Sequence, residues 1–155
     1  MPEMTPRRGS DPAEFDLVDF LPYLLNQAGE EASLAFQQVY KDRYGMLRTE
    51  WRVLFHLGRY GRMTAREIGM RSKMHKTKIS RAVAKLEERR FLTRSRDLED
   101  RRMEYLELTQ AGARAYADLR EVAREYDARL TAAFSSEDMA VVRRVLKRLA
   151  GFEDG

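Results

Sequence analysis

The spacing of the apolar residues changes at one place in this 155-residue chain, and this change constrains the fold more than any other feature. Over most of the chain, apolar side chains recur every three or four residues, which is the period of an amphipathic helix. After Leu92, residues 104–108 alternate polar and apolar side chains as a half-buried strand does, and residues 93–96 can supply a partner strand. The pattern therefore predicts a mainly α chain with a small β-hairpin, an α+β fold in which four helices precede the hairpin and two follow it.

Capping residues set the expected ends of the first two helices. Asp19 can cap the first helix, which places Pro22 in its first turn, where the missing proline N–H costs no hydrogen bond. Gly45 then ends this helix after about 25 residues, or roughly 37 Å, and a helix this long usually has a partner along its length. Thr49 is the expected cap of the second helix, which stops near Gly61.

Two helices in tandem are expected next. Thr64 and Glu67 form a capping box, in which each side chain satisfies a free backbone N–H of the other, and this box opens a short helix. A brief turn at residues 72–75 leads to a longer helix over residues 76–89. The apolar residues on the inward side of the longer helix are Ile79, Val83 and Leu86. Its basic and hydroxyl side chains fall mostly elsewhere, so the pair has the layout of a helix-turn-helix.

Positive charge is concentrated in one segment. The whole chain carries a formal charge of only +4, but residues 62–102 hold fourteen Lys or Arg against six acidic residues. This segment therefore carries +8 and the rest of the chain −4. Such a distribution is typical of a polyanion binder. A solvated helix surface is the alternative, and charge alone favours it, so the interpretation depends on the motifs.

Several classes of protein are excluded by what the chain lacks. It has no cysteine, which excludes disulfides and thiolate metal sites and fits a reduced cytoplasm. No apolar run reaches 18 residues, so we expect no membrane span. Residues 1–14 contain arginines without a following apolar stretch, which predicts a disordered tail rather than a signal peptide. His56 and His75 lie far apart without clustered acids, so we expect no metal, no cofactor and no enzyme.

Three motifs lie in the segment from about residue 44 to residue 112: residues 74–81 at the start of the predicted 76–89 helix, Asp-Arg-Arg at 100–102 in the hairpin tip, and Leu-Thr-x-x-Gly at 108–112. Together they give the segment a resemblance to the MarR family of bacterial regulators. It implies one MarR-like domain over 15–155, with a winged helix-turn-helix at 46–109 and homodimerisation helices at 15–45 and 110–151. Arg90 departs from the family, which usually has Gly at this left-handed position, and we expect a cost of about 1 kcal/mol there.

The start of the 76–89 helix provides the expected contacts with the major groove. An α-helix fits this groove, and side chains near its N-terminus reach base edges. The residues expected to touch bases are Thr77, Lys78 and Arg81. The residues expected to hold phosphates are His75, Lys76 and Ser80, with Lys85 and Arg89 acting by charge attraction alone. For any single residue, plain phosphate attraction is the alternative to base reading.

The hairpin tip, residues 97–103, is expected to enter the minor groove. A narrow minor groove concentrates negative potential and attracts an inserted arginine, a role we assign to Arg102. Asp100 lies two residues earlier, so its carboxylate can hold the guanidinium in one orientation across a tight turn. Arg101 is expected to bind a phosphate or take a secondary role. The alternative is a surface salt bridge that contributes little.

An effector pocket is implied only by the family resemblance, which suggests a small aromatic or phenolic ligand held between the dimer helices and the winged region. The candidate residues are Tyr23, Asn26, Trp51, Arg52 and His56. Arg52 could pair with a ligand carboxylate and Trp51 could stack on a ring. The alternatives are a core role for Trp51 and His56, and a surface or interface role for Arg52.

Three functions are compatible with these features. The leading one is a sequence-specific repressor that binds a pseudo-palindromic operator through recognition helices about 34 Å apart. A ligand that prefers a mis-spaced state would release it, and an activator would use the same DNA contacts. A protein-interaction module would not need the base-reading residues. A non-specific architectural binder predicts no preference between operator and random duplex, whereas the repressor predicts a gap of about 10³-fold or more.

Overall fold

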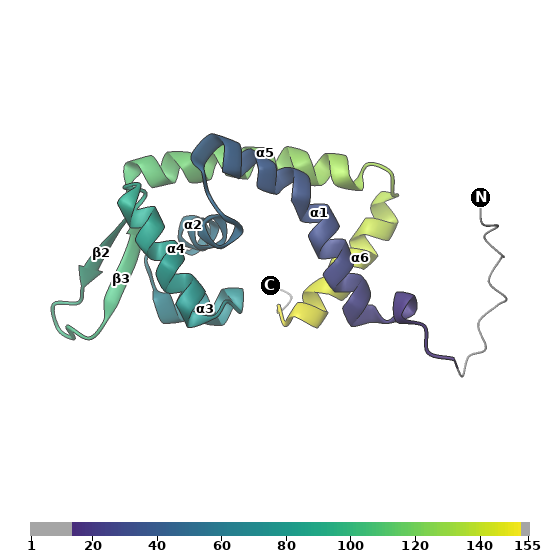
Figure 1. Cartoon of the computed structure of the whole chain (residues 1–155), viewed down its shortest axis with the longest axis horizontal. Helices are drawn as coiled ribbons and strands as arrows, with labels where there is room; N and C mark the ends of the chain where they lie inside the picture. Colours follow the sequence, from purple (N-terminus) through teal and green to yellow (C-terminus); the bar gives the residue numbers. More distant parts are fainter. Residues whose placement is uncertain (1–13, 153–155) are drawn as a thin grey trace, which may run out of the picture. The chain divides into compact units, whose positions relative to one another are not determined.

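The computed structural model describes residues 14–152 (Figure 1). The protein divides into two units between Ala35 and Phe36. In the first unit, the short 3₁₀ helix η1 (Leu17–Asp19) precedes the first turns of helix α1 (Leu21–Tyr44). The prediction of a disordered tail over residues 1–14 lies outside the described residues except for Glu14.

The start of α1 differs from the prediction. Asp19 does not cap α1, because it is the last residue of η1 and α1 begins only after Phe20. Asp16 is the residue that caps here: its carboxylate accepts the Val18 N–H at 3.1 Å and so starts η1. Pro22 does lie in the first turn of α1, as predicted, where no hydrogen bond is lost.

The second unit contains the remaining elements. After the end of α1 they are α2 (Arg48–Tyr60), β1 (Met63–Thr64), α3 (Ala65–Ser72), α4 (Lys76–Glu88), β2 (Leu92–Arg96), β3 (Glu104–Leu108), α5 (Gln110–Thr131) and α6 (Ser136–Ala150). The predicted order of helices and hairpin is confirmed, and so is the mainly α class with a small β-sheet.

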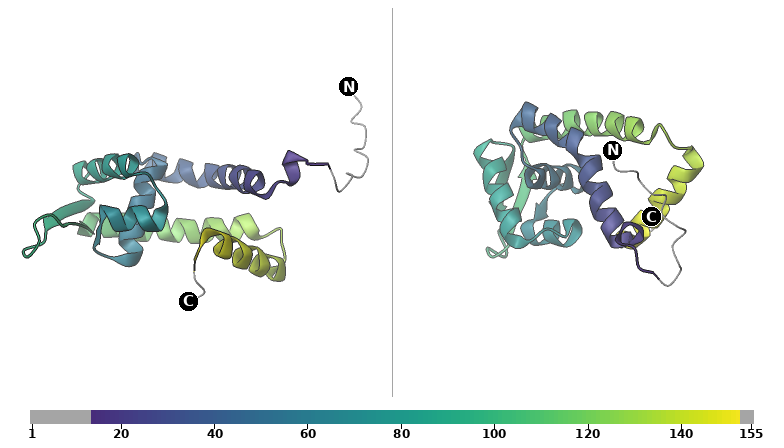
Figure 2. Two further views of the ribbon diagram at one scale, coloured as in Figure 1. Left: turned by 90° about the horizontal axis from the view of Figure 1, so that it is seen from below. Right: turned by 45° about the vertical axis from the view of Figure 1, so that its right-hand side comes forward.

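The sheet has one strand more than predicted. Its order is β1-β3-β2, and all pairs are antiparallel. β1 contains only Met63 and Thr64, paired with Leu106 and Tyr105, and two residues are too short to show a strand period. The tip of the β2–β3 hairpin extends past α3 and α4 (Figure 1; Figure 2, left).

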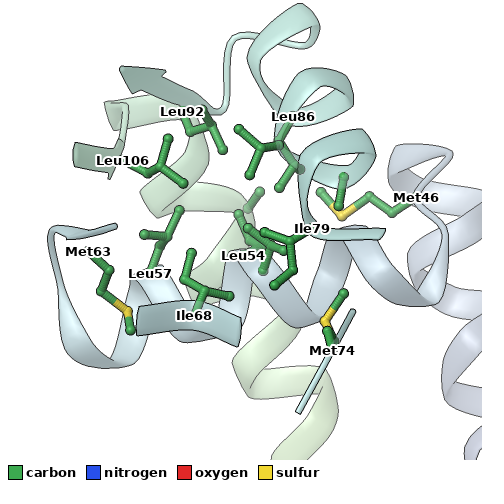
Figure 3. Packing of buried hydrophobic residues seen from close by; sticks show 14 of the residues in the cluster. Met46, Leu54, Leu57, Met63, Ile68, Met74, Ile79, Leu86, Leu92 and Leu106 are labelled. Carbon is green, nitrogen blue, oxygen red and sulfur yellow. The ribbon is translucent and has the colours of Figure 1, made fainter. Parts of the chain in front are cut away.

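A hydrophobic core joins α2, α3, α4 and the sheet (Figure 3). The apolar side of α4 faces this core, since Ile79, Val83 and Leu86 are at most 2% exposed. Leu54 from α2 and Leu106 from β3 meet them there. Full burial of one such side chain stabilises a fold by about 1.5–3 kcal/mol, so the orientation of α4 is strongly fixed.

Side-chain caps define the starts of the helices around this core. The Thr64 hydroxyl accepts the Glu67 N–H at 3.1 Å at the start of α3, as the capping box predicted. At α2 the prediction is wrong, because Thr49 lies inside the first turn. The Glu50 carboxylate accepts the Leu47 N–H at 2.9 Å instead, so an acid in the first turn performs the capping.

The end of α4 is fastened to the start of α5 by the Leu-Thr-x-x-Gly motif. Arg90 has φ +62°, which confirms that the chain needs a left-handed residue here. The Thr109 hydroxyl donates to the Arg90 carbonyl at 2.6 Å. A Cβ on Gly112 would lie 1.9 Å from the Phe91 carbonyl oxygen, so only glycine allows this close approach.

Candidate nucleic-acid interface

The N-terminal half of α4 presents a polar, basic face to solvent. The exposed residues on it are Lys76, Thr77, Lys78, Ser80 and Arg81. Within the described part of the chain, the side chains of Lys76, Lys78 and Arg81 have no ion pair or hydrogen bond. The core holds the other side of the helix, so these cations are free to meet a ligand from outside.

His75 caps this helix. Its Nδ1 accepts the Thr77 N–H at 3.2 Å, which satisfies one of the free N–H groups at the start of α4. In the neutral ring the hydrogen then lies on Nε2, and His75 is exposed. The residue therefore combines a structural role with a free N–H donor beside the basic face.

The C-terminal end of α4 is less available. Lys85 lies 3.7 Å from Glu88, an exposed pair of little energetic weight. Arg89 has a structural role, because its guanidinium donates to the carbonyls of Tyr44 and Gly45. It also lies 3.7 Å from the buried carboxylate of Glu50. The predicted phosphate contact of Arg89 is therefore not supported.

The hairpin tip contains the predicted carboxylate–guanidinium contact. The Asp100 Oδ1 accepts the backbone N–H of Arg102 at 3.1 Å and its Nε–H at 3.3 Å. The Arg102 side chain is 93% exposed, so it is held at one end and open to solvent elsewhere. Arg101 is exposed as well, and its carbonyl accepts from Arg96 at 3.3 Å.

Arginines at the base of the hairpin fix it to the helices. Arg94 pairs with Glu87 of α4 and with Glu104 of β3, each at 3.1 Å. Arg62, which precedes β1, lies 4.1 Å from the centre of the Tyr105 ring of β3, a cation–π contact on the sheet. These arginines, although they belong to the basic segment, serve the position of the wing.

Arg66 is a candidate that sequence reasoning missed. It is exposed in the first turn of α3 and lines, with Lys76 and Ser80, a cavity of about 450 Å³ between α3 and α4. The only sequence signal was its position inside the Thr64–Glu67 capping box, which was interpreted as a structural motif. Its nearness to α4 is a consequence of the tertiary fold.

The structure distributes the five predicted pocket residues over different environments. Tyr23 and Asn26 belong to α1 in the first unit, and both are exposed. In the second unit the Trp51 ring packs between Phe36 and Phe55, with ring centres 5.4 and 4.7 Å away. Trp51 is thus part of an aromatic cluster beside the core.

Arg52 and His56 are both bound to backbone carbonyls. Arg52 donates to the Ser72 carbonyl at 2.7 Å, at the end of α3, and burial followed by repulsion from Arg48 lowers the pKa of its guanidinium. The His56 Nδ1 lies 2.6 Å from the Arg52 carbonyl. His56 lines a cavity of about 770 Å³ between α2, α3, α5 and α6.

α6 leaves its apolar side uncovered. None of its residues is buried among the described residues. The exposed apolar residues of α6 are Val141, Val142, Val145, Leu146 and Leu149, each between 41 and 54% exposed. Four of them follow helical spacing along one stripe, a pattern that usually meets another protein surface.

Other kinds of site find no support between residues 14 and 152. No three His, Asp or Glu side chains in this part of the chain gather closely enough to hold a metal ion. No helix in the same range is sufficiently long and apolar to cross a membrane.

Sequence comparison places residues 44–103 in a match with the model of the MarR family. The chain is also 26% identical over 118 residues to the HTH-type transcriptional regulator YwoH of Bacillus subtilis. That match covers 75% of this chain and 85% of YwoH. Residues 44–103, which match the family model, include the tandem helices α3 and α4 and the hairpin tip.

Solved structures share the fold over most of the chain. The MarR family transcriptional regulator SPO1453 from Silicibacter pomeroyi is 29% identical with a TM-score of 0.76, covering 88% of this chain and 96% of its own. BpsR of Bordetella bronchiseptica, whose DNA binding is regulated by 6-hydroxynicotinic acid, has a TM-score of 0.78. At 16% identity, with 90% of this chain and 99% of BpsR covered, that likeness shows the fold alone.

Proposed function

Because the chain belongs to the MarR family of transcriptional regulators, we propose that it is a homodimeric repressor that binds a pseudo-palindromic DNA operator in the bacterial cytoplasm. The observation that carries this proposal is the exposed face of α4, where Lys76, Lys78 and Arg81 have no ion pair among the described residues. A helix with such a face fits the major groove and its phosphates. Regulators of this family act by binding DNA rather than by catalysis.

In the proposed complex, Thr77, Lys78 and Arg81 read bases. Arginine and lysine can bond the O6 and N7 of guanine, and a threonine methyl can pack on thymine. The residues assigned to phosphates are His75, Lys76 and Ser80. The free Nε2–H of His75 supports that assignment, because neutral imidazole can donate through it to a phosphate oxygen.

The wing, residues 97–103, enters the minor groove with Arg102 inserted. The hydrogen bond from the Nε–H of Arg102 to Asp100 supports this role, because a guanidinium that is already oriented loses less conformational entropy on insertion. Arg101 is assigned to a neighbouring phosphate. A surface salt bridge without a DNA role would leave operator affinity unchanged when Arg102 is removed.

Homodimerisation uses the helices predicted at 15–45 and 110–151, while 46–109 form the winged helix-turn-helix. The uncovered apolar stripe on α6 supports this division, because burial of such a stripe against a second copy removes it from water. The dimer then sets the spacing of the two α4 helices at about 34 Å, one turn of the duplex.

Release by a small aromatic or phenolic ligand is the remaining part of the proposal. BpsR, whose fold this chain shares, responds to an aromatic acid. Tyr23, Asn26, Trp51, Arg52 and His56 remain the candidate contacts. A ligand that binds a mis-spaced dimer more tightly lowers operator affinity by its preference for that state.

Selection of bound sequences from a random DNA pool, followed by fluorescence anisotropy, tests the proposal. At fixed physiological salt we expect the selected duplex to bind about 10³-fold or more tightly than a scrambled duplex of the same length. A palindromic consensus indicates a dimer bound to two half-sites. Equal affinity for both duplexes would contradict the proposal and favour an architectural binder.

A further inference from the structure

The C-terminal end of α4 is fastened to the turn that follows α1. Arg89 caps this end, and its guanidinium donates through Nη1 to the Tyr44 carbonyl and through Nη2 to the Gly45 carbonyl, the latter at 2.8 Å. A guanidinium presents its donors in a rigid plane, so two acceptors at once fix its direction. We call these two hydrogen bonds the Arg89 fork. It joins residues that lie 44 positions apart in the sequence.

The turn is shaped to receive this guanidinium. Gly45 has φ +62°, a left-handed conformation that favours glycine. A Cβ at this position would lie 3.2 Å from the Nη1 of Arg89, which is tighter than ordinary contact. The absence of a side chain at Gly45 therefore lets the guanidinium reach both carbonyls without displacement.

A buried carboxylate from α2 lies beside the Arg89 fork. The Glu50 side chain is 2% exposed, and its Oε1 lies 3.7 Å from the Nη2 of Arg89. Within residues 14–152 this oxygen has no hydrogen-bond partner. Burial of an unpaired charge is costly, so the nearby guanidinium compensates Glu50 and is itself drawn toward α2.

The same turn is also fastened to α5. Asp118 of α5 accepts from the Tyr44 hydroxyl at 2.7 Å and from Arg43 at 2.8 Å. Burial, followed by the hydrogen bond to Asp118, raises the pKa of Tyr44 to about 12, so its hydroxyl still donates at neutral pH. The Tyr44 ring also meets Phe91, just after α4, with ring centres 5.9 Å apart. Contacts thus run from α4 through the end of α1 to α5.

Apolar packing joins the same parts of the protein but constrains angles less. Phe55 of α2 packs edge-on against Tyr116 of α5, with ring centres 5.2 Å apart. The hydrophobic effect is non-directional, so such packing resists separation more than rotation. Hydrogen bonds weaken steeply away from linear geometry, so the Arg89 fork resists rotation as well. The packing and the fork together hold α4 at one angle to α5.

We propose that Arg89 is a positioning residue for operator recognition: it fixes the angle between α4 and α5 and so sets the half-site spacing that the homodimer accepts. α4 carries the proposed base contacts, and α5 belongs to the proposed dimerisation region. One extra base pair between half-sites moves them about 3.4 Å apart and turns them by about 34°. A dimer discriminates against such a change only if its two α4 helices are held firmly. This consequence for DNA rests on the proposed function.

The angle can be measured without DNA, by the distance between two spin labels in one chain. The chain has no cysteine, so Ala84→Cys on α4 and Arg114→Cys on α5, both at exposed positions, provide the label sites. Dilution with unlabelled chains restricts the signal to distances within one chain. We expect a single narrow distribution in the otherwise unchanged protein, and one about twofold broader when the fork is removed, because several angles are then populated.

The fork is removed by Glu50→Gln together with Arg89→Gln. Substitution of Arg89 alone would leave a buried carboxylate without its cation, which is strongly destabilising. The glutamine amide can still accept the Leu47 N–H, which Glu50 accepts at 2.9 Å. Thermal unfolding checks that the fold persists.

Two matched controls separate the fork from the charges around it. Glu50→Gln alone removes the buried carboxylate and keeps the fork. Arg90→Gln removes an arginine charge at the next position, from an exposed side chain. Both controls should keep the narrow distance distribution.

Operators with altered spacing test the consequence for DNA. Fluorescence anisotropy compares the selected operator with versions that carry one base pair more or fewer between the half-sites. The unsubstituted protein and both controls should bind the altered operators about 100-fold more weakly, because the two half-sites are no longer engaged together. The Glu50→Gln/Arg89→Gln protein should lose only about tenfold on them. It should also bind the selected operator about tenfold more weakly, since only a fraction of its dimers has the matching angle.

The proposal is overturned if the distance distribution of the Glu50→Gln/Arg89→Gln protein is as narrow as that of the unsubstituted protein. It is also overturned if the spacing preference is unchanged, which would leave Arg89 a structural role alone. An equal loss on all operators, with a salt dependence lowered by about one phosphate contact, would make Arg89 a DNA ligand instead. A broader distribution in a protein that selects no operator supports the role of Arg89 in fixing the angle and contradicts the proposed function.

Discussion

Helices α4 and α6 are both short and amphipathic, yet they leave opposite sides free. In α4 the apolar side is buried, with Ile79 2% and Leu86 0% exposed, and the basic side faces solvent. In α6 no residue is buried, and Leu149 is 54% exposed. The free surface of α4 therefore suits a polyanion, whereas that of α6 suits an apolar protein surface.

The difference between the two helices shows what an apolar stripe does not reveal by itself. Both stripes follow the same helical period. The stripe of α4 finds its cover within the chain, from α2, α3 and the sheet. The stripe of α6 finds no cover within residues 36–152, and a second copy is the partner we propose.

Of the substitutions considered, negative charges placed on the apolar stripe of α6 should lower operator affinity most. Val142→Glu together with Leu146→Glu would bury carboxylates in the proposed dimer interface, which is strongly unfavourable. We expect light scattering to report a monomer of 18.1 kDa. Operator affinity should fall about 100-fold or more, because the two half-sites would no longer be bound together.

Arg144→Gln is the matched control for this pair, since Arg144 is exposed on α6 outside the apolar stripe. Light scattering of the Arg144→Gln variant should still report the mass of a dimer. If the doubly substituted protein remained a dimer with normal operator binding, the α6 stripe would not be the dimer interface.

The next effect should come from the basic side of α4. Arg81→Ala should cost about 1–3 kcal/mol in operator binding and relax the sequence preference at one base pair of each half-site. Lys85→Ala is the control, because Lys85 already lies beside Glu88 and is assigned only to phosphate attraction. Anisotropy against operators mutated at single base pairs measures both quantities. A uniform loss across all operators would reduce Arg81 to a phosphate contact.

The wing should contribute less to operator affinity than α4 does, and two variants separate the contributions of its cation and of the carboxylate that holds it. Arg102→Ala removes the inserted cation and should weaken operator binding about tenfold, which is about 1.4 kcal/mol. Asp100→Asn keeps the cation and loses only its charged partner, so it should cost about 0.2–1 kcal/mol, as exposed pairs do. Competition assays at physiological salt resolve the two values. An unchanged affinity in Arg102→Ala would show that the wing does not use this residue.

The smallest expected effect is on folding stability, at the contact between the end of α1 and α5. The Tyr44 hydroxyl donates to Asp118 at 2.7 Å, and Arg43 donates to it at 2.8 Å. These two contacts, the tyrosine first, lower the pKa of the Asp118 carboxyl below its ordinary 3.8. Asp118→Asn should cost less than about 1 kcal/mol near neutral pH, because the pair is partly exposed.

The sign of the pH dependence checks this joint. A carboxyl with a lowered pKa stabilises the folded state above its ordinary value of 3.8, and the contribution disappears as the pH falls through the lower folded value. Urea unfolding at pH 7 and below pH 3 should therefore show a gap between wild type and Asp118→Asn that closes in acid. A gap that stays constant would mean that the charge of Asp118 has no part in it.

Local patterns predicted local geometry well. The Asp100–Arg102 contact follows from a spacing of two residues, and the structure contains it. The Thr64 cap was predicted on the same local basis, whereas the left-handed Arg90 was predicted from the family resemblance. Two local predictions of caps were wrong. Asp19 ends the short helix η1, which Asp16 caps, and does not cap α1. At α2 the capping expected from Thr49 is performed by Glu50.

Features that depend on distant residues were missed. β1 exists only because β3 lies beside Met63 and Thr64. Arg89 appeared to be one more cation of the basic helix until Gly45, 44 residues away, supplied its acceptor. The cavity between α2, α3, α5 and α6 joins arginines that are far apart in the chain and carry no shared motif.

The sequence by itself determined the order of the elements, the inward side of α4 and the contact at the wing tip, because helical period, strand period and short-range hydrogen bonds act over a few residues. The tertiary structure decided which cations remain free. Arg81 lies within α4 and Arg89 caps its C-terminal end. Their side-chain chemistry is the same, yet Arg81 is open to solvent and Arg89 is bound to backbone carbonyls. Whether a charge is available to a ligand depends on acceptors brought near by folding.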